Sequence, residues 1–226
     1  MALPHIAIID YGAGNLRSVA KAFEKLGFPP RVTTDPQEVA AADAVVLPGV
    51  GAAGDSMSNL AARGMTDVVK EAITKDKPFF GVCLGLQLLF ETSDEGGVDC
   101  LSALPGRVRH LPSGVKVPHI GWNQVRLTRP HPLFQGIQGE QYFYFVHSFY
   151  ADPAKPELVA GVTDYAIPFC SFAAKGNLVA TQFHPEKSGT LGLQLYDNFV
   201  RRIVGAGGRG VASRAPSTPQ RRARGS

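Results

Sequence analysis

Short apolar runs alternate with amphipathic stretches over the first ninety residues of the chain. Runs of consecutive apolar residues, such as Ile6–Ile9, predict strands of a sheet that is covered on both faces. The stretch from Leu16 to Leu26 predicts a helix because its apolar residues recur at intervals of three and four. Asn15 is suited to cap the start of this helix, and Gly27 is suited to end it. Further strands are predicted over residues 31–34, 44–47 and 79–82, and further helices over 66–74 and 84–90.

The second half of the chain has a different pattern, in which turn residues cluster between positions 93 and 114. The strand-like runs that follow lie at 116–120, 124–127, 142–150 and 158–162. The runs 171–174 and 178–183 flank a Lys-Gly-Asn turn and predict a hairpin, and a last apolar stripe predicts a helix over 190–204. Together these patterns predict an α/β fold, with a largely parallel central sheet, helices on both faces and an antiparallel, hairpin-rich extension.

The composition is that of a soluble domain, since 44% of the 226 residues are hydrophobic and 19% are charged. No apolar run approaches the roughly 20 residues that cross a bilayer. The first residues also lack the pattern of a secretion signal. We therefore expect a cytoplasmic protein that does not bind membranes.

The net charge of +4 comes from the end of the chain, where residues 205–226 hold five arginines and no acid. This segment is rich in Gly, Ser, Pro and Arg, which predicts a disordered basic tail behind a domain that spans residues 1–204. Basic tails also suit nucleic-acid binding. No aromatic residue interleaves these arginines, so we expect no nucleic-acid partner.

Cys83 carries the strongest chemical signal. It lies between a predicted strand and a predicted helix, with Gly81 and Gly85 two residues away on either side. A sharp turn from strand to helix crowds its neighbours, and glycine relieves the crowding. The start of a helix favours thiolate over thiol, and the amide of Leu84 is placed to donate to an oxyanion. The chain has no CxxC pair and no metal-ligand spacing of its histidines, so we expect neither a metal nor a cofactor.

His184 and Glu186 are the predicted partners of this cysteine. They follow the predicted strand 178–183, and open α/β sheets build their sites at strand ends. Pro185 favours an extended His184, and alternate residues of an extended chain face the same side. We therefore expect the Glu186 carboxylate to orient the His184 imidazole, which then serves Cys83 as an acid and base.

A second oxyanion donor is expected in the loop Pro48–Gly51, which follows a predicted strand. Its two glycines let backbone N–H groups approach a ligand closely. The candidate donors in this loop are Val50 and Gly51.

These motifs together resemble the glutamine amidotransferases that use a Cys-His-Glu triad, and more narrowly the glutaminase subunits of imidazole glycerol phosphate synthase. The resemblance runs from about Ile6 to Val204. It is carried by residues 10–16, 48–51, 81–90 and 184–189, with support from 118–123 and 146–150.

The resemblance implies a three-layer, flavodoxin-like fold and a reaction that splits L-glutamine into glutamate and ammonia through a thioester on Cys83. It also implies a partner, a (βα)8-barrel cyclase that uses the ammonia to make imidazole glycerol phosphate and an aminoimidazole carboxamide ribotide. By position it implies that Gln87, Glu95, Ser148 and Phe149 hold glutamine. Phe149 stands where tyrosine is common in the family, and Ala52-Ala53 follows the loop where an aromatic residue is frequent.

A partner is also expected on chemical grounds. Ammonia is mostly ammonium at neutral pH, which is a poor nucleophile, and the sequence shows no second site that would consume it. A protected transfer within a heterodimer is the simplest solution. We expect the docking face to include Asn15, Trp122 and Lys187.

Three other interpretations are weaker. Gly12-Ala-Gly14 is similar to a dinucleotide-binding motif, but Arg17 occupies the third glycine position, where helix packing needs a small residue. A stand-alone cysteine hydrolase would act on peptides or other amides without a partner. A non-enzymatic binding protein would depend on the basic segment 205–226.

Overall fold

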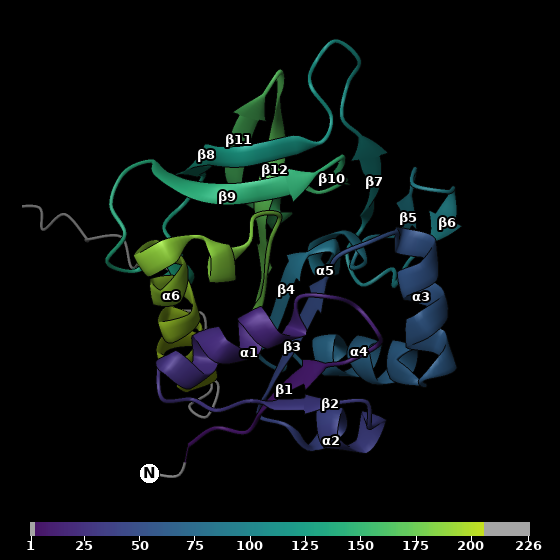
Figure 1. Ribbon diagram of the computed structural model, residues 1–226, viewed down its shortest axis with the longest axis vertical. Coiled ribbons are helices and arrows are strands. Elements are labelled where there is room, and N and C mark those ends of the chain that lie inside the picture. Colours follow the sequence, from purple (N-terminus) through teal and green to yellow (C-terminus); the bar gives the residue numbers. More distant parts are fainter. Residues whose placement is uncertain (1–2, 206–226) are drawn as a thin grey trace, which may run out of the picture.

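Five parallel strands form the centre of the molecule, which is described here by a computed structural model of residues 3–205. They lie in the order β2-β1-β3-β4-β13 (Figure 1). Their bounds are β1 (Ile6–Ile9), β2 (Arg31–Thr33), β3 (Ala44–Gly49), β4 (Phe79–Cys83) and β13 (Leu178–Thr181). This order is that of the flavodoxin-like folds, so the predicted fold class is confirmed.

Helices cover both faces of these strands (Figure 1). One face carries α1 (Leu16–Lys25) and α6 (Gly189–Asn198), and α6 continues as a π-helix over Phe199–Val204. The other face carries α2 (Pro36–Ala41), α3 (Ala53–Ala62), α4 (Met65–Thr74) and the single turn α5 (Leu84–Gln87). The result is the expected three-layer arrangement.

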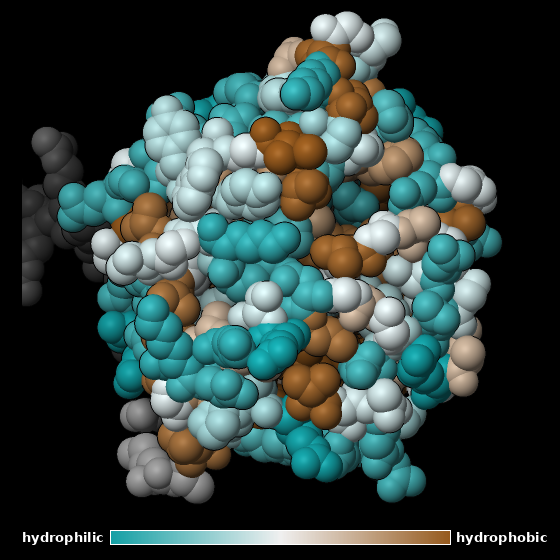
Figure 2. Space-filling view, viewed as in Figure 1, coloured by the Kyte–Doolittle hydropathy of each residue, from teal (hydrophilic) through white to brown (hydrophobic). Residues whose placement is uncertain are grey.

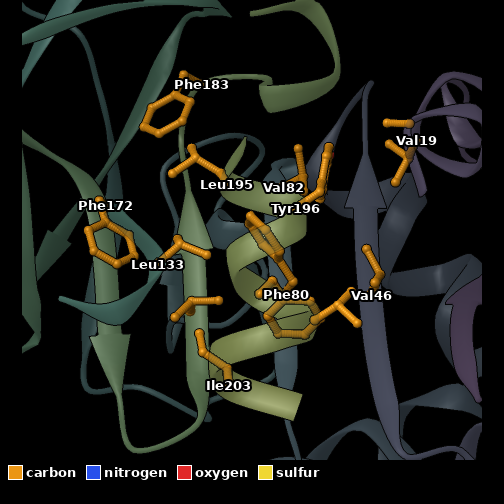
Figure 3. Packing of buried hydrophobic residues seen from close by; sticks show 14 of the residues in the cluster. Val19, Val46, Phe80, Val82, Leu133, Phe172, Phe183, Leu195, Tyr196 and Ile203 are labelled. Carbon is orange, nitrogen blue, oxygen red and sulfur yellow. The ribbon is translucent and has the colours of Figure 1, made fainter. Parts of the chain in front are cut away.

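Successive residues of the four inner parallel strands, β1, β3, β4 and β13, point into different cores. Phe80 packs into the core beneath α1 and α6, where its ring centroid lies 5.3 Å from that of Tyr196 (Figure 3). Phe79 packs into the core beneath α3 and α4. The strands are therefore apolar on both sides, which explains why they stand out in the sequence as unbroken hydrophobic runs.

A largely antiparallel extension continues the sheet beyond β13, with one parallel pair between β5 and β7. The sheet runs on through β12 (Ile167–Lys175), β10 (Phe149–Pro153), β7 (Gly106–His110), β5 (Thr92–Ser93) and β6 (Val98–Asp99). A branch is formed by β11 (Val159–Tyr165), β8 (His119–Leu127) and β9 (Gln141–His147). Single 3-10 turns cover Pro132–Phe134, Pro156–Leu158 and Pro185–Lys187. The hairpin of β12 and β13 confirms the one predicted around the Lys-Gly-Asn turn.

Three strand predictions in this extension are wrong in extent. The runs 116–120 and 124–127 belong to one strand, β8, which begins at His119. The run 142–150 is divided at Ser148, because β9 pairs with β8 whereas β10 turns away to pair with β7. The change of partner places Ser148 at a break between strands.

Three predictions about helices also need correction. The helix predicted over 84–90 ends at Gln87 and continues only as a turn. Helices α2 and α3 were not predicted, because α2 has only six residues and α3 contains Gly, Ser and Asn, which are weak helix formers. Asn15 makes no capping hydrogen bond to α1, since its side chain donates to Glu186 instead. Gly27 ends α1 as predicted, with a φ of 82° and an N–H that donates to the carbonyl of Glu24.

The described part of the chain ends at Gly205, so the predicted basic tail lies outside it apart from that residue. The domain limit at 204 stays a prediction. Within residues 3–205, no helix combines the length and the apolar character needed to cross a membrane.

The substitution Gly85→Ala tests how tightly α5 is packed on β3. A Cβ at position 85 would lie 1.8 Å from the carbonyl oxygen of Leu47, a backbone atom that cannot move aside. We expect Gly85→Ala to lower the free energy of unfolding by about 3 kcal/mol or more, measured by urea denaturation.

The matched control is Gly54→Ala in α3, where the added Cβ would meet Val98 at an ordinary 3.5 Å. It should be neutral or stabilise the protein by up to about 1 kcal/mol. Equal unfolding free energies for the two variants would contradict this account.

Candidate active site

Cys83 occupies a strained turn between β4 and α5. Its φ of 55° and ψ of −108° lie outside the regions that residues with a side chain normally adopt. The turn is possible because its neighbours are small: a Cβ at Gly85 would strike Leu47, and one at Gly81 would lie 3.0 Å from the carbonyl oxygen of Gly85. The predicted role of the two glycines is therefore confirmed by the packing.

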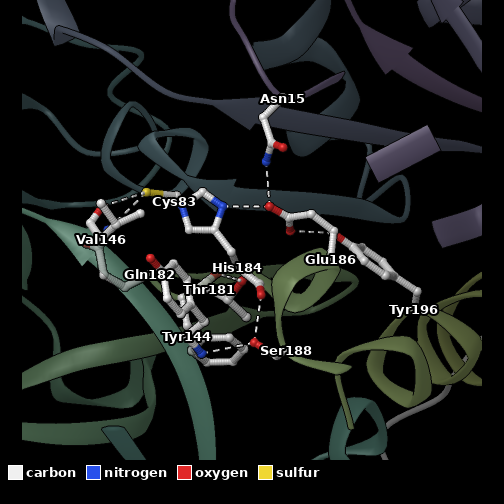
Figure 4. Close-up of polar contacts among 11 residues, drawn as sticks. Asn15, Cys83, Tyr144, Val146, Thr181, Gln182, His184, Glu186, Ser188 and Tyr196 are labelled. Carbon is white, nitrogen blue, oxygen red and sulfur yellow. Dashed lines mark hydrogen bonds and ion pairs between the residues drawn. The ribbon is translucent and has the colours of Figure 1, made fainter. Parts of the chain in front are cut away.

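The side chains of His184 and Glu186 come together next to Cys83, with the imidazole between the sulfur and the carboxylate (Figure 4). His184 Nδ1 lies 2.6 Å from Glu186 Oε1, and both side chains are fully buried. The predicted contact is present, although its geometry differs from the prediction. His184 is extended, with φ −102° and ψ 99°, but Glu186 lies in a 3-10 turn that bends its carboxylate back towards the ring.

The Glu186 carboxylate is held by two further donors. Asn15 Nδ2 donates to Oε1, and the Tyr196 hydroxyl donates to Oε2 at 3.2 Å. Burial would raise the pKa of Glu186, but the hydrogen bond and charge of His184, with the Asn15 contact, hold it below its usual range. The carboxylate is therefore charged and fixed in position.

The charge state of His184 follows from the same contacts. Burial would lower the pKa of His184, but the neighbouring Cys83 sulfur and the Glu186 carboxylate favour the charged ring and raise it to about 10. Its Nε2 is buried without a hydrogen-bond partner and faces the sulfur (Figure 4). The ring thus has one nitrogen committed to Glu186 and the other free to exchange a proton at the sulfur or at a bound substrate.

The surroundings of the sulfur differ from the expectation in one respect. The helix after Cys83 has only one turn, so its dipole contributes less to a sulfur anion than a full helix would. Gln182 Nε2 donates towards the sulfur at 3.7 Å, and the carbonyl of Val146 lies 3.9 Å from it. The Gln182 amide is therefore placed to contribute part of the stabilisation of a sulfur anion that was expected from the helix.

A pocket of about 300 Å³ opens beside Cys83, a size that suits a small molecule. The structure brings all the predicted oxyanion and substrate residues to this pocket. It is lined by Leu84, Val50, Gly51, Gln87, Glu95, Ser148 and Phe149, together with Cys83, Pro118, Val146 and His147.

The loop that bears Val50 is anchored at its far end. Glu95 Oε2 accepts a hydrogen bond of 2.8 Å from the backbone N–H of Ala53, the first residue of α3. Gly51 has a φ of 106°, which favours glycine at this position. The carboxylate of Glu95 therefore fixes the loop as well as lining the pocket, and the contact uses only the backbone of Ala53.

The three residues predicted for docking differ in environment. Trp122 is 55% exposed on β8, and its ring packs edge to face against Tyr144 of β9. Lys187 Nζ lies 5.9 Å from the centre of the Tyr144 ring. Figure 2 shows hydrophobic and near-neutral side chains gathered over β8 and β9. Asn15 instead turns its side chain inward to Glu186.

Three residues at the site were not predicted: Gln182, His147 and Tyr196. The parallel register of β13 and β4 pairs Thr181 with Val82, so Gln182 follows beside Cys83. Counting from the aligned strand ends would have found Gln182. Neither His147 nor Tyr196 shows a local signal in the sequence that marks it as part of the site.

A second and larger hollow of about 670 Å³ is lined by residues between Leu127 and Ile137 and shares none with the pocket beside Cys83. Its only imidazole, His131, accepts a hydrogen bond from the backbone N–H of Leu133. It offers no reactive group, so the chemistry belongs to the smaller pocket.

Comparison with known proteins identifies the family of the chain. A family profile described as "Glutamine amidotransferase class-I" matches residues 7–203. Two solved structures, "Crystal structure of glutamine amidotransferase" and "Structure of PurLQS from Thermotoga maritima", superpose with TM-scores of 0.70. Each is 17% identical, and the matches cover 88% of this chain and 98% and 99% of theirs. The chain therefore belongs to the class-I glutamine amidotransferase family.

More similar sequences place the chain within that family. It is 53% identical over 206 residues to "Imidazole glycerol phosphate synthase subunit HisH" of Moorella thermoacetica, covering 91% of this chain and 98% of the relative. The protein of the same name from Dehalococcoides mccartyi is 49% identical over 201 residues, with 88% and 98% covered. The chain groups with the HisH subunits, and the predicted resemblance is confirmed.

The substitution Glu186→Gln tests the orientation of the imidazole. The amide is the same size, but it removes the charge that favours a Nδ1–H tautomer. We expect glutamine turnover to fall by roughly 100- to 10,000-fold with little change in fold, measured as glutamate release beside a circular dichroism spectrum.

The comparison variant is Tyr196→Phe, which removes one hydrogen bond to the same carboxylate and keeps the ring packing. It should reduce turnover by less than about tenfold. If Glu186→Gln kept more than a tenth of the original rate, the carboxylate would not have the orienting role assigned to it.

Proposed function

We propose that this chain is the glutaminase subunit of an imidazole glycerol phosphate synthase. It hydrolyses L-glutamine to glutamate and passes the ammonia to a synthase subunit in histidine biosynthesis. The observation that carries the proposal is the arrangement of sulfur, imidazole and carboxylate beside a pocket for a small molecule (Figure 4). The similarity to HisH subunits over nearly the whole chain supports the substrate and the pathway.

In the first half of the reaction, the Cys83 sulfur attacks the carboxamide carbon of glutamine. The electron pair of the carbonyl moves to its oxygen, and the N–H of Leu84 with an N–H from the loop at Val50 and Gly51 stabilises the negative charge. One such donor is worth about 2.7–4 kcal/mol. The carbonyl then re-forms, the C–N bond breaks, and Nε2 of His184 gives its proton to the departing nitrogen. Ammonia leaves and a thioester remains.

In the second half, water hydrolyses the thioester. His184, now neutral, takes a proton from the water as it attacks the acyl carbon. The C–S bond breaks, glutamate leaves, and the pair of Cys83 and His184 is restored. Glu186 keeps Nδ1 protonated throughout, so the ring cycles between imidazole and imidazolium without turning.

The glutamine is held by the groups that line the pocket away from the sulfur. We assign this role to Gln87, Glu95, Ser148 and Phe149. The Glu95 carboxylate is suited to the α-ammonium group of the substrate, and amide and backbone groups are suited to its carboxylate and side chain.

Ammonia must leave without entering water, which requires a partner at the rim. We propose that a (βα)8-barrel cyclase docks there, against Trp122, Lys187 and the segment at Asn15, and that the complex works in the cytoplasm. Exposed aromatic rings beside a cation are typical of energetically important interface residues.

The nucleophile is tested with Cys83→Ala. Removal of the sulfur should abolish glutamine-dependent synthesis by the complex, while synthesis from added ammonium salt continues, because the partner's chemistry does not need this residue. The measurement is product formation with either nitrogen source.

The control is Cys100→Ala, since burial raises the pKa of the Cys100 thiol to about 11 and leaves it unreactive at neutral pH. Glutamine turnover by Cys83→Ala, or cleavage of peptides by the free subunit at a rate that matches glutamine, would favour a stand-alone hydrolase instead.

The docking face is tested with Lys187→Glu. Reversal of this charge beside Tyr144 should raise the Kd of the complex by at least about tenfold, or about 1.4 kcal/mol, in a titration followed by calorimetry. Lys70→Glu, on the exposed side of α4, should leave the Kd unchanged. Equal affinities of both variants would argue for a different docking surface.

A further inference from the structure

The backbone carbonyl of Phe149 is the centre of a hydrogen-bond network at the edge of the pocket. It accepts from Gln87 Nε2 at 2.8 Å and from His147 Nδ1 at 2.9 Å. A carbonyl oxygen can only accept, so both contacts fix their donors. Gln87 must present its nitrogen to Phe149, and His147 must carry its proton on Nδ1.

The orientation of a second amide follows from the first. Gln87 Nε2 also lies 3.1 Å from Gln182 Oε1, so the oxygen of Gln182 accepts the second N–H of Gln87. The nitrogen of Gln182 is therefore the atom that faces the Cys83 sulfur at 3.7 Å. Gln182 is fully buried, and its amide has one arrangement that satisfies these contacts.

The amide of Gln87 is equally constrained. Both N–H groups of Gln87 are used within the protein, one by Phe149 and the other by Gln182. Only the oxygen of Gln87 remains for a ligand in the pocket that it lines. Gln87 therefore offers the substrate an acceptor and no donor.

On the other side of Phe149, the network extends through two imidazoles. His147 Nε2 accepts from His119 Nδ1 at 2.9 Å, and His119 Nε2 lies 3.3 Å from the amide nitrogen of Asn123. The two histidines are paired directly across β8 and β9. The tautomers of His147 and His119 are set by the carbonyl of Phe149 at one end of this network and by the amide of Asn123 at the other.

This pair of imidazoles is neutral. Burial lowers the pKa of His147 to about 3 and that of His119 to about 4. The groups packed on them are the aromatic rings of Phe145, Phe169 and Tyr165, and the charged ring of His184 acts on His147 from the site. A proton added to Nε2 of His147 would face the Nδ1–H of His119, and one added to Nε2 of His119 would face the amide N–H of Asn123, so the network requires neutral histidines.

We propose that Gln182, His147 and His119 are positioning residues for the glutamine pocket. His119 and His147 hold the Phe149 carbonyl and so fix the Gln87 amide with its oxygen towards the substrate. Gln182 fixes the same amide and directs an N–H at the sulfur of Cys83, where it stabilises the anion. This inference rests on the proposed function for the role of Gln87, whereas the contact with the sulfur is independent of it.

The sulfur contact is tested with Gln182→Met, which keeps the length of the side chain and removes both the N–H and the acceptor. Alkylation of Cys83 by iodoacetamide is followed from pH 5 to 9 in the full-length protein, with peptide mapping to separate Cys83 from Cys100 and Cys170. We expect the rate at pH 7 to fall at least about tenfold. The pH of half-maximal rate should also move upward.

The control for this measurement is Gln37→Met, an exposed glutamine at the start of α2, which should alkylate as the parent protein does. An unchanged rate and pH profile in a folded Gln182→Met protein would overturn the proposed contact. Because alkylation needs no glutamine turnover, this result stands even if the proposed reaction were refuted.

The imidazole pair is tested with His147→Leu and His147→Asn. Leucine removes the donor to Phe149, and we expect the KM for glutamine to rise at least about fivefold with kcat and the alkylation rate within about threefold of the parent. The Asn amide nitrogen falls where Nδ1 lay, so His147→Asn should recover most of the affinity. If His147 had only a structural role, His147→Leu would lower kcat and stability as well as raise KM. His147→Asn would then not restore the affinity for glutamine.

A second variant protects the test against misfolding. His119→Phe keeps a ring stacked between Phe145 and Tyr165 and removes the N–H that His147 accepts, together with the weaker contact to Asn123. We expect a smaller rise in KM, of about two- to fivefold. A KM equal to that of the parent in folded His119→Phe and His147→Leu would overturn the role of the pair.

Discussion

The parallel pairing of β4 with β13 is the constraint on which the site depends. Its register sets Val82 beside Thr181, so the two strands end at the same level and the residues that follow leave the sheet together. Cys83 and Gln182, ninety-nine positions apart in the chain, meet for this reason. A slip of one residue would turn Gln182 away from the sulfur, because successive residues of a strand face opposite sides. Backbone hydrogen bonds therefore align the reactive groups.

The site also shows how a buried charge pair is tolerated. His184 and Glu186 are fully removed from water, which is costly unless the remaining hydrogen-bonding capacity is satisfied. Asn15 and Tyr196 supply donors to the carboxylate from α1 and α6, the two helices that cover one face of the sheet. Asn15, from the other end of the chain, and Tyr196, from the helix that follows Glu186, thus help to hold one imidazole in place. The same arrangement explains why Asn15 is not available to cap α1.

Much of this organisation is visible in the sequence. The apolar runs of the parallel strands, the glycines around Cys83 and the spacing of His184 and Glu186 each have a local cause that can be recognised without coordinates. The division at Ser148 cannot be recognised in this way, because it follows from the choice between β7 and β8 as strand partners. The same holds for His147, whose neutral state and single tautomer arise from contacts across two strands. Local sequence patterns predicted the reacting residues, whereas tertiary contacts determine which residues hold them in position.

The network around Phe149 has a consequence for how this position varies. The pocket uses the main-chain carbonyl of residue 149, while the Phe149 ring packs edge to face on His110. A polar group on that ring contributes nothing to the carbonyl contacts, so replacing the family's frequent tyrosine with phenylalanine leaves them intact. The network therefore tolerates a change of side chain at position 149. Insertion or deletion of a single residue beside Ser148 would instead displace the Phe149 carbonyl and break its hydrogen bonds.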